Sequence, residues 1–265
     1  MRPTYCYWSV VDGGYVDMMR TVIRSARQVG VFKDFHIWCD RPIDDAISHE
    51  LKDFDKSTLL FKINFLRDAA KALNYDYFVW LDADSYFVRN PGDVLRVLHS
   101  SPVHATLECD ACDPNNRRMA WWECALSRYA RLMRAKGVTS KSIFNVNAGF
   151  WIVHHDVIDR FCDLALDFYD LWKRDGHDPF PEEPAMAYAV QMLCGNPYAH
   201  TLPYSSDLWA SDWTGCWERH LPDGRPWMFE NYFNGDRCMV NPAIVHTMRG
   251  KDLLLESSEA ASQKA

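Results

Sequence analysis

Apolar and polar positions group into blocks that predict strands and helices in alternation along most of the chain. Runs rich in aromatic and β-branched residues predict strands, and apolar residues at intervals of three or four predict helices. The expected strands lie at 4–11, 35–39, 78–81, 103–107, 144–153 and 241–246. The expected helices lie at 15–29, 59–73, 91–99, 158–172 and 185–193, with a weaker helical pattern over 43–54. This alternation predicts a single large α/β unit.

Two segments interrupt the alternation, and a third ends it. Residues 109–142 combine basic side chains with two adjacent tryptophans, which predicts an insertion or lid of one or two helices over the functional edge of the sheet. A solvated basic face is the simpler interpretation, and peripheral contact with an anionic membrane surface is the alternative. Residues 208–233 are aromatic and irregular, as in a sugar-binding wall or a loop-rich core. Residues 254–265 predict a flexible tail after a domain spanning 1–253.

Composition narrows the classes of function. The 265 residues are 48% apolar, enough for a sizeable core. The net charge of −7, with both signs interspersed, excludes the basic footprint of a nucleic-acid-binding protein. No apolar run reaches membrane-spanning length and no signal peptide opens the chain, which favours a cytoplasmic protein. The sequence carries no signal for an oligomeric state.

The nine cysteines are scattered, and their odd number argues against a disulfide framework. Several lie within apolar runs, where a free thiol behaves as a small hydrophobe. Cys109 and Cys112 have the spacing of a zinc knuckle, but no second Cys or His pair follows at the usual distance. Structural zinc is therefore not expected.

The candidate chemistry centres on Asp82 and Asp84, which separate two short apolar runs. Side chains two positions apart on a strand point to the same side, so both carboxylates can bind one cation. Two carboxylates leave most of the coordination of Mg²⁺ or Mn²⁺ to water and phosphate oxygens, which predicts a metal site completed by a diphosphate. Ordinary turn chemistry is the alternative interpretation of two aspartates after a strand.

This acidic motif resembles the signature of the GT-A glycosyltransferases, in which Asp-x-Asp lies between two short apolar strands. Within that group the chain is most similar to family 8, which contains glycogenin and the lipopolysaccharide galactosyltransferases. The resemblance implies a Rossmann-like α/β domain with a mostly parallel mixed sheet flanked by helices. Besides the acidic motif, the stretches that carry it, in the family's order, are Tyr15, Lys62, 145–151, and His246 with Gly250 and Lys251.

The resemblance also assigns metal and phosphate ligands. It implies that Asp82, Asp84 and His246 hold Mn²⁺ or Mg²⁺. Gly250 and Lys251 follow the histidine in the closing motif, and the lysine would contact the diphosphate. The donor would be a nucleotide sugar, most often a UDP-hexose in this family.

Other positions acquire roles in binding the donor. The first strand, turn and helix form an opening typical of nucleotide-binding folds. Tyr15 would stack on the base while Asp12 accepts a hydrogen bond from its edge; alternatively Tyr15 is the first core contact of its helix and Asp12 its cap. Lys62 would reach the donor, although a lone helical lysine is usually a solvated charge. Asn147 and Gly149 would face the donor sugar, since glycine lets it approach the backbone.

The stereochemical outcome depends on residues at the start of the 185–193 helix. Glu182 and Glu183 stand where family 8 usually has Asp-Gln. Acidic residues there are favoured by the helix dipole, which is the simplest interpretation. The family implies retention of anomeric configuration. If the enzyme inverts, Glu183 is the candidate base for the acceptor hydroxyl.

These features predict a metal-dependent glycosyltransferase that moves a hexose from a UDP-sugar to a glycan or another hydroxyl acceptor. A sugar-phosphate nucleotidyltransferase is the first alternative, but the turn after the first strand lacks the basic residue of a phosphate loop. A non-catalytic carbohydrate-binding protein is the second alternative. Such a protein has no evident need for Asp82, Asp84 and His246.

Overall fold

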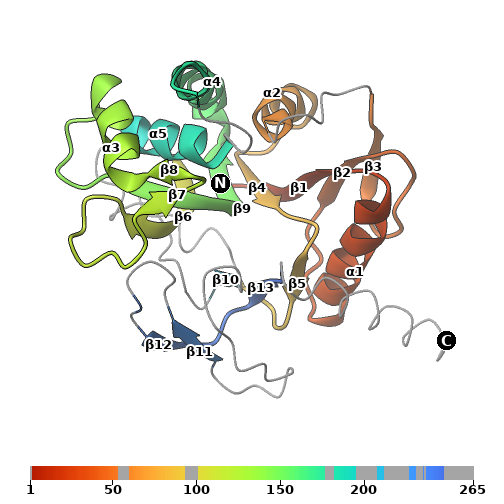
Figure 1. Ribbon diagram of the computed structural model, residues 1–265. Coiled ribbons are helices and arrows are strands. Elements are labelled where there is room, and N and C mark those ends of the chain that lie inside the picture. The colour runs from red at the N-terminus through yellow and green to blue at the C-terminus, as the bar shows by residue number, and fades with distance from the viewer. Residues whose placement is uncertain are drawn as a thin grey trace.

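The computed structural model describes residues 2–52, 60–92, 101–176, 182–194, 208–211, 227–230, 235 and 237–247, and the statements below concern these residues. They form a mixed α/β structure in which a central sheet is flanked by helices (Figure 1). This arrangement is compatible with a Rossmann-like fold. Within the described residues, no helix combines the length and apolarity needed to cross a bilayer.

The central sheet has six strands in the order β3-β2-β1-β4-β9-β6. Strands β1 to β4 pair in parallel, while β9 runs antiparallel to both β4 and β6. The sheet is therefore mixed, and the carboxyl ends of its parallel strands share one edge. Its strands are β1 (Tyr5–Val11), β2 (Phe35–Cys39), β3 (Ile47–Glu50), β4 (Tyr77–Leu81), β6 (Val103–Asp110) and β9 (Phe144–His154).

Apart from the edge strand β3, the strands of this sheet bury side chains on both faces, because side chains alternate along a strand and helices or a second sheet cover each face. On β1, Cys6 and Trp8 pack in one core with α2, α4 and α5, whereas Tyr5 and Tyr7 pack in a second core with α1. Because these strands are buried on both faces, their sequences are nearly continuous apolar runs. The helices are α1 (Gly14–Gln28), α2 (Phe61–Ala72), α4 (Ile158–Arg174) and α5 (Glu182–Cys194).

A second sheet of three strands, β10-β13-β5, belongs to the core that contains α1. Strand β5 (Ser85–Phe87) follows β4 directly, and β13 (Ile244–His246) lies between β5 and β10 (Trp209–Ser211). The Ser25 hydroxyl of α1 accepts the Phe87 amide at 3.0 Å, which ties β5 to the helix. This small sheet brings the late part of the chain beside the turn after β4.

The segment 109–142 forms a β-hairpin followed by one helix. Strands β7 (Ala120–Trp121) and β8 (Cys124–Ala125) precede α3 (Leu126–Ala135), and the α3 residue Tyr129 packs edge-on against Phe168 and Trp172 of α4. The remaining elements are η2 (His155–Val157), β11 (Trp227–Glu230) and β12 (Arg237–Val240). Among the one or two helices expected in this segment, the structure has one, α3.

The strands expected at 4–11, 35–39, 78–81, 103–107 and 144–153 are confirmed, as are the four long helices. The helical region predicted over 43–54 was wrong, because residues 47–50 form the edge strand β3. Its side chains are mostly exposed, so no buried face imposes a clear period on the sequence. Most of the expected helix at 91–99, most of 208–233 and the tail 254–265 lie outside the described residues.

Candidate metal centre

Asp82 and Asp84 lie in the tight turn between β4 and β5 rather than on a strand. The amide of Asp82 donates to the carbonyl of Gly149 on β9 at 3.0 Å, and the Ser85 amide donates to the Asp82 carbonyl at 3.1 Å. The expected closeness of the two carboxylates is confirmed, but its expected cause was wrong. A turn, and not alternation along a strand, places them together.

His246 reaches this turn through the small sheet. In β13 it stands opposite Ser85 of β5 on one side and opposite Ser211 of β10 on the other. The next residue, Thr247, donates its amide to the Asp84 carbonyl at 2.8 Å and its hydroxyl to the same oxygen at 3.0 Å. The backbone around His246 is therefore fastened to the backbone around Asp84.

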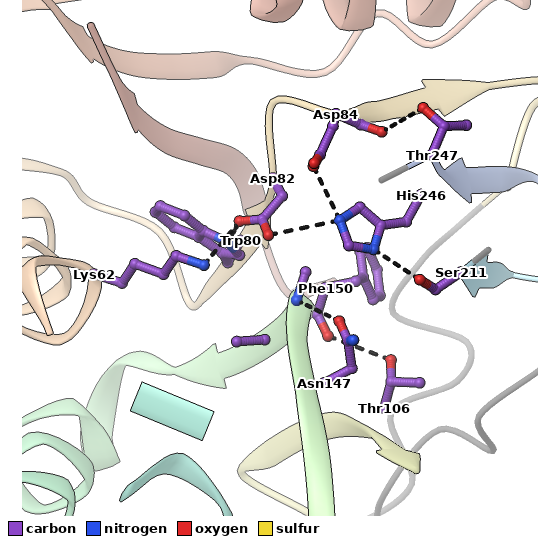
Figure 2. Close-up of polar contacts among 12 residues, drawn as sticks. Lys62, Trp80, Asp82, Asp84, Thr106, Asn147, Phe150, Ser211, His246 and Thr247 are labelled. Atoms are coloured by element: carbon purple, nitrogen blue, oxygen red, sulfur yellow. Dashed lines mark hydrogen bonds and ion pairs between the residues drawn. The ribbon is translucent and has the colours of Figure 1, made fainter. Parts of the chain in front are cut away.

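The three side chains converge on one point, as Figure 2 shows. His246 Nε2 lies 2.9 Å from Asp84 Oδ1 and 3.8 Å from Asp82 Oδ2, and the three candidate ligand atoms are all within 4.8 Å of one another. Nδ1 lies 2.9 Å from the Ser211 hydroxyl, which orients the ring as outer-shell partners orient metal-binding histidines. Two carboxylates and an imidazole suit a divalent cation such as Mn²⁺.

Lys62 is buried beside this centre and is not a solvated charge. Its Nζ lies 3.0 Å from Asp82 Oδ1 and 3.6 Å from Glu182 Oε1. Burial opposes the charge, but the carboxylates of Asp82 and Glu182 outweigh it and raise the pKa of Lys62. The ammonium group therefore stays charged near neutral pH and stands next to the candidate metal ligands.

A bulge in β9 lies against the metal centre. Ala105 pairs with Trp151, but its neighbour Thr106 pairs with Asn147, so residues 148–150 leave the ladder with β6. Bulges of this kind often re-aim groups beside functional sites. At its middle, Gly149 packs closely against the metal centre, because an added Cβ would lie 3.1 Å from His246 Cε1.

The side-chain amide of Asn147 forms hydrogen bonds with other residues of the protein. Its Oδ1 accepts the Gly149 amide at 2.8 Å, and its Nδ2 donates to Glu108 at 3.1 Å. Asn145 donates to the other oxygen of Glu108, also at 3.1 Å. Asn147 thus holds the shape of the bulge, and it is Gly149 that lies against His246.

Glu108 is a residue that the sequence analysis missed. It follows the expected strand 103–107, where nothing marks a glutamate as buried. Burial raises its pKa to about 7, although the hydrogen bond from Asn147 acts in the opposite direction. A carboxyl group that titrates near neutrality therefore lies within one hydrogen bond of the bulge.

Glu182 and Glu183 are both buried at the start of α5, so their role is not only to cap this helix. Glu183 accepts hydrogen bonds on both oxygens, from the Ala148 amide at 3.0 Å and from the Trp122 indole. Burial, with the nearby charges of Glu108 and Glu182, raises the pKa of Glu183. By contrast, Oε2 of Glu182 has no hydrogen-bond partner in the described part of the chain.

Asp12 and Tyr15, which were predicted to bind the nucleotide base, follow the carboxyl end of β1. The neighbouring strand β4 leads to the metal centre. The side chain of Tyr15 is 50% exposed, so its interpretation as a core contact was wrong. Gly13 occupies the N-cap position of α1, and Asp12 therefore precedes the cap. The φ angle of Gly13 is 54°, which glycine adopts easily. Gly250 and Lys251 lie outside the described residues.

Comparison of the sequence with profiles of known protein families and with curated proteins finds no match. The arguments for a function therefore rest on the residues and the geometry described above. Among these, the convergence of Asp82, Asp84 and His246 is the most specific observation.

Proposed function

We propose that this protein is a metal-dependent glycosyltransferase of the GT-A fold, which transfers a hexose from a UDP-sugar to a glycan or another hydroxyl acceptor. The observation that carries the proposal is the Asp82–Asp84–His246 cluster after β4, with the Lys62 ammonium beside it. The strand order 3-2-1-4 in the parallel part of the sheet supports it. In such sheets ligands bind at the carboxyl ends of the strands.

The charges of the cluster suit the departure of a diphosphate. Asp82, Asp84 and His246 would hold Mn²⁺ or Mg²⁺, which stabilises negative charge on phosphate oxygens. Lys62 supplies a second, fixed positive charge 3.0 Å from Asp82. A preorganised cation stabilises the charge that grows on the leaving group more than water does.

The two glutamates of α5 have different roles in this proposal. Glu183 would be a poor base for the acceptor hydroxyl, because both of its oxygens already accept hydrogen bonds from the protein. Glu182 keeps one buried oxygen without a partner among the described residues, next to Lys62. A buried carboxylate oxygen without a donor is costly, and a ligand hydroxyl or an ordered water can supply that donor. We infer that Glu182 binds a sugar hydroxyl.

Retention of the anomeric configuration needs no base at Glu183, which agrees with the hydrogen bonds that both of its oxygens accept. Inversion requires a carboxylate that can remove the proton of the attacking hydroxyl group. Side chains of Asn147, His246 and Trp209 fill the space beside Gly149, so this glycine contributes by letting β9 pack closely against the metal centre rather than by admitting a sugar. Asn147 contributes by shaping the bulge in β9.

Calorimetric titration tests the proposal. UDP, with GDP as a comparison, is titrated into the protein with and without Mn²⁺, and the experiment is repeated with Asp84→Ala. We expect Mn²⁺-dependent UDP binding that is lost in Asp84→Ala and kept in Asp156→Ala, which changes an exposed aspartate of η2. Absence of nucleoside diphosphate binding under every condition would overturn the proposal.

A further inference from the structure

Trp80 contacts a metal-ligand candidate directly, although it lies in the hydrophobic core. It is the penultimate residue of β4 and is 1% exposed, on the side of the sheet that packs with α2 and α4. Its indole Nε1 donates a hydrogen bond of 2.7 Å to Oδ1 of Asp82, two residues along the chain (Figure 2). A hydrogen bond to a charged group is stronger than one between neutral groups.

The same carboxylate oxygen receives a second donor. Lys62 Nζ lies 3.0 Å from Oδ1 of Asp82, and also 5.2 Å from the centroid of the Trp80 ring. The indole therefore contacts the carboxylate through its N–H group and the ammonium through its face. Two donors on Oδ1 leave Oδ2 as the oxygen directed at His246, 3.8 Å from its Nε2.

We propose that Trp80 is a positioning residue of the metal centre: by holding Oδ1, it makes Asp82 present Oδ2 alone to the cation. This inference rests on the metal-dependent function proposed above. A carboxylate held in this way binds as a ligand through one oxygen. More coordination positions then stay open for the oxygens of a diphosphate or water.

Neighbouring tryptophans show that this hydrogen bond is not a requirement of packing. Trp8 and Trp151 contact the Trp80 ring at centroid distances of 4.7 and 5.9 Å and are equally buried. Within the described structure, neither indole N–H has a hydrogen-bond partner. Of these three buried indoles, the one whose N–H is satisfied is the one that faces a candidate ligand.

Trp151 supplies a matched control for a test. Trp80→Phe removes the donor and part of the ring, while Trp151→Phe removes a similar volume from the same stack and an N–H without a partner. Mn²⁺ alone is titrated into each protein, and free Mn²⁺ is measured by electron paramagnetic resonance. We expect Trp80→Phe to weaken Mn²⁺ binding by about tenfold or more, and Trp151→Phe by less than about twofold.

Equal affinities in the wild type and Trp80→Phe, or equal losses in both variants, would overturn the role of Trp80. A wild-type protein that binds no Mn²⁺ would overturn both this inference and the metal-dependent function. If Mn²⁺ binds but UDP does not, the assignment of UDP-sugar as donor fails. The role of Trp80 is then still decided by the Mn²⁺ affinities of Trp80→Phe and Trp151→Phe.

A measurement on the wild-type protein covers the case in which Trp80→Phe does not fold. With ¹⁵N-labelled tryptophan, we expect one indole N–H signal to move on titration with Mg²⁺. The same signal should be displaced in Asp82→Ala, because its acceptor is lost. If no indole signal responds to both changes, Trp80 does not position Asp82.

Discussion

Buried Lys62 and partly exposed Asp82 form an ion pair in which Nζ lies 3.0 Å from Oδ1, although they are 20 residues apart in the sequence. The pair joins α2 to the turn after β4, and Glu182 of α5 extends it at 3.6 Å. Three elements thus meet in one charged cluster. The Lys62 ammonium belongs to the protein itself, so part of the negative charge of the cluster is offset before any ligand binds.

Replacing Lys62 with methionine should destabilise the protein and increase the effect of metal on its stability. The change leaves buried Glu182 and partly exposed Asp82 without their counterion, which costs about 3 kcal/mol. Mn²⁺ should then raise the melting temperature more in Lys62→Met than in the wild type, because it replaces the lost charge. Thermal unfolding with Mn²⁺ or with EDTA measures both effects.

Lys71→Met is the control for this prediction. Lys71 lies on the same helix but is exposed, 4.0 Å from an exposed Asp68. Its replacement should change the free energy of unfolding by less than about 0.5 kcal/mol. Similar losses in the two variants would show that Lys62 contributes as a surface charge only.

Gly149→Ala should disturb the metal centre through His246. The added methyl group would lie 3.0 to 3.1 Å from Asn147 Oδ1, His246 Cε1 and Trp209 Cζ2, closer than most such contacts. We expect a loss of about 1–3 kcal/mol in stability and of about tenfold in Mn²⁺ affinity. Gly14→Ala adds a methyl group in open space and should leave Mn²⁺ affinity unchanged. Unaltered Mn²⁺ affinity in Gly149→Ala would contradict the packing argument.

Glu108 should make stability fall as pH rises towards neutrality. Burial raises its pKa from 4.5 to about 7, so between these values the folded protein keeps a proton that the unfolded chain releases. Stability from this group is therefore complete below pH 4.5 and is lost by about pH 7, a change on the order of 1–3 kcal/mol. Urea unfolding in EDTA at pH 5 and pH 7.5 measures it. Glu108→Gln should lack this part of the pH dependence; equal slopes would refute the assignment.

The turn that presents Trp122 to Glu183 should be strained. Trp122 and Glu123 form the two-residue loop between β7 and β8, with φ angles of 48° and 61°. Left-handed backbone costs a non-glycine residue about 1–2 kcal/mol, against about 0.5–1 kcal/mol of entropy for glycine. Glu123→Gly should therefore stabilise the protein by about 0.5–1 kcal/mol in thermal unfolding, and Glu123→Ala should not. A gain in both variants would exclude relief of strain as the cause.

Much of the fold was predictable because burial on both faces produces continuous apolar strands, and burial on one face produces helical periods. The edge strand β3 was not predictable, because its side chains are mostly exposed and its sequence has no clear alternation of apolar and polar residues. At the candidate site, the acidic motif could be identified from Asp82 and Asp84 together with the apolar runs on either side of them. The placement of Lys62 and His246 was expected only through a family resemblance, and Glu108 was missed.

The sequence by itself determined the succession of strands and helices and the pair of carboxylates after β4, because hydrophobic period and neighbouring residues are local properties of the chain. Only the tertiary structure decided which charges are buried together. The pairing of β13 with β5 brings His246 to Asp84, and the packing of α2 and α5 brings Lys62 between Asp82 and Glu182. Such contacts join residues far apart in the chain, so burial and charge compensation at the site arise only when the elements pack.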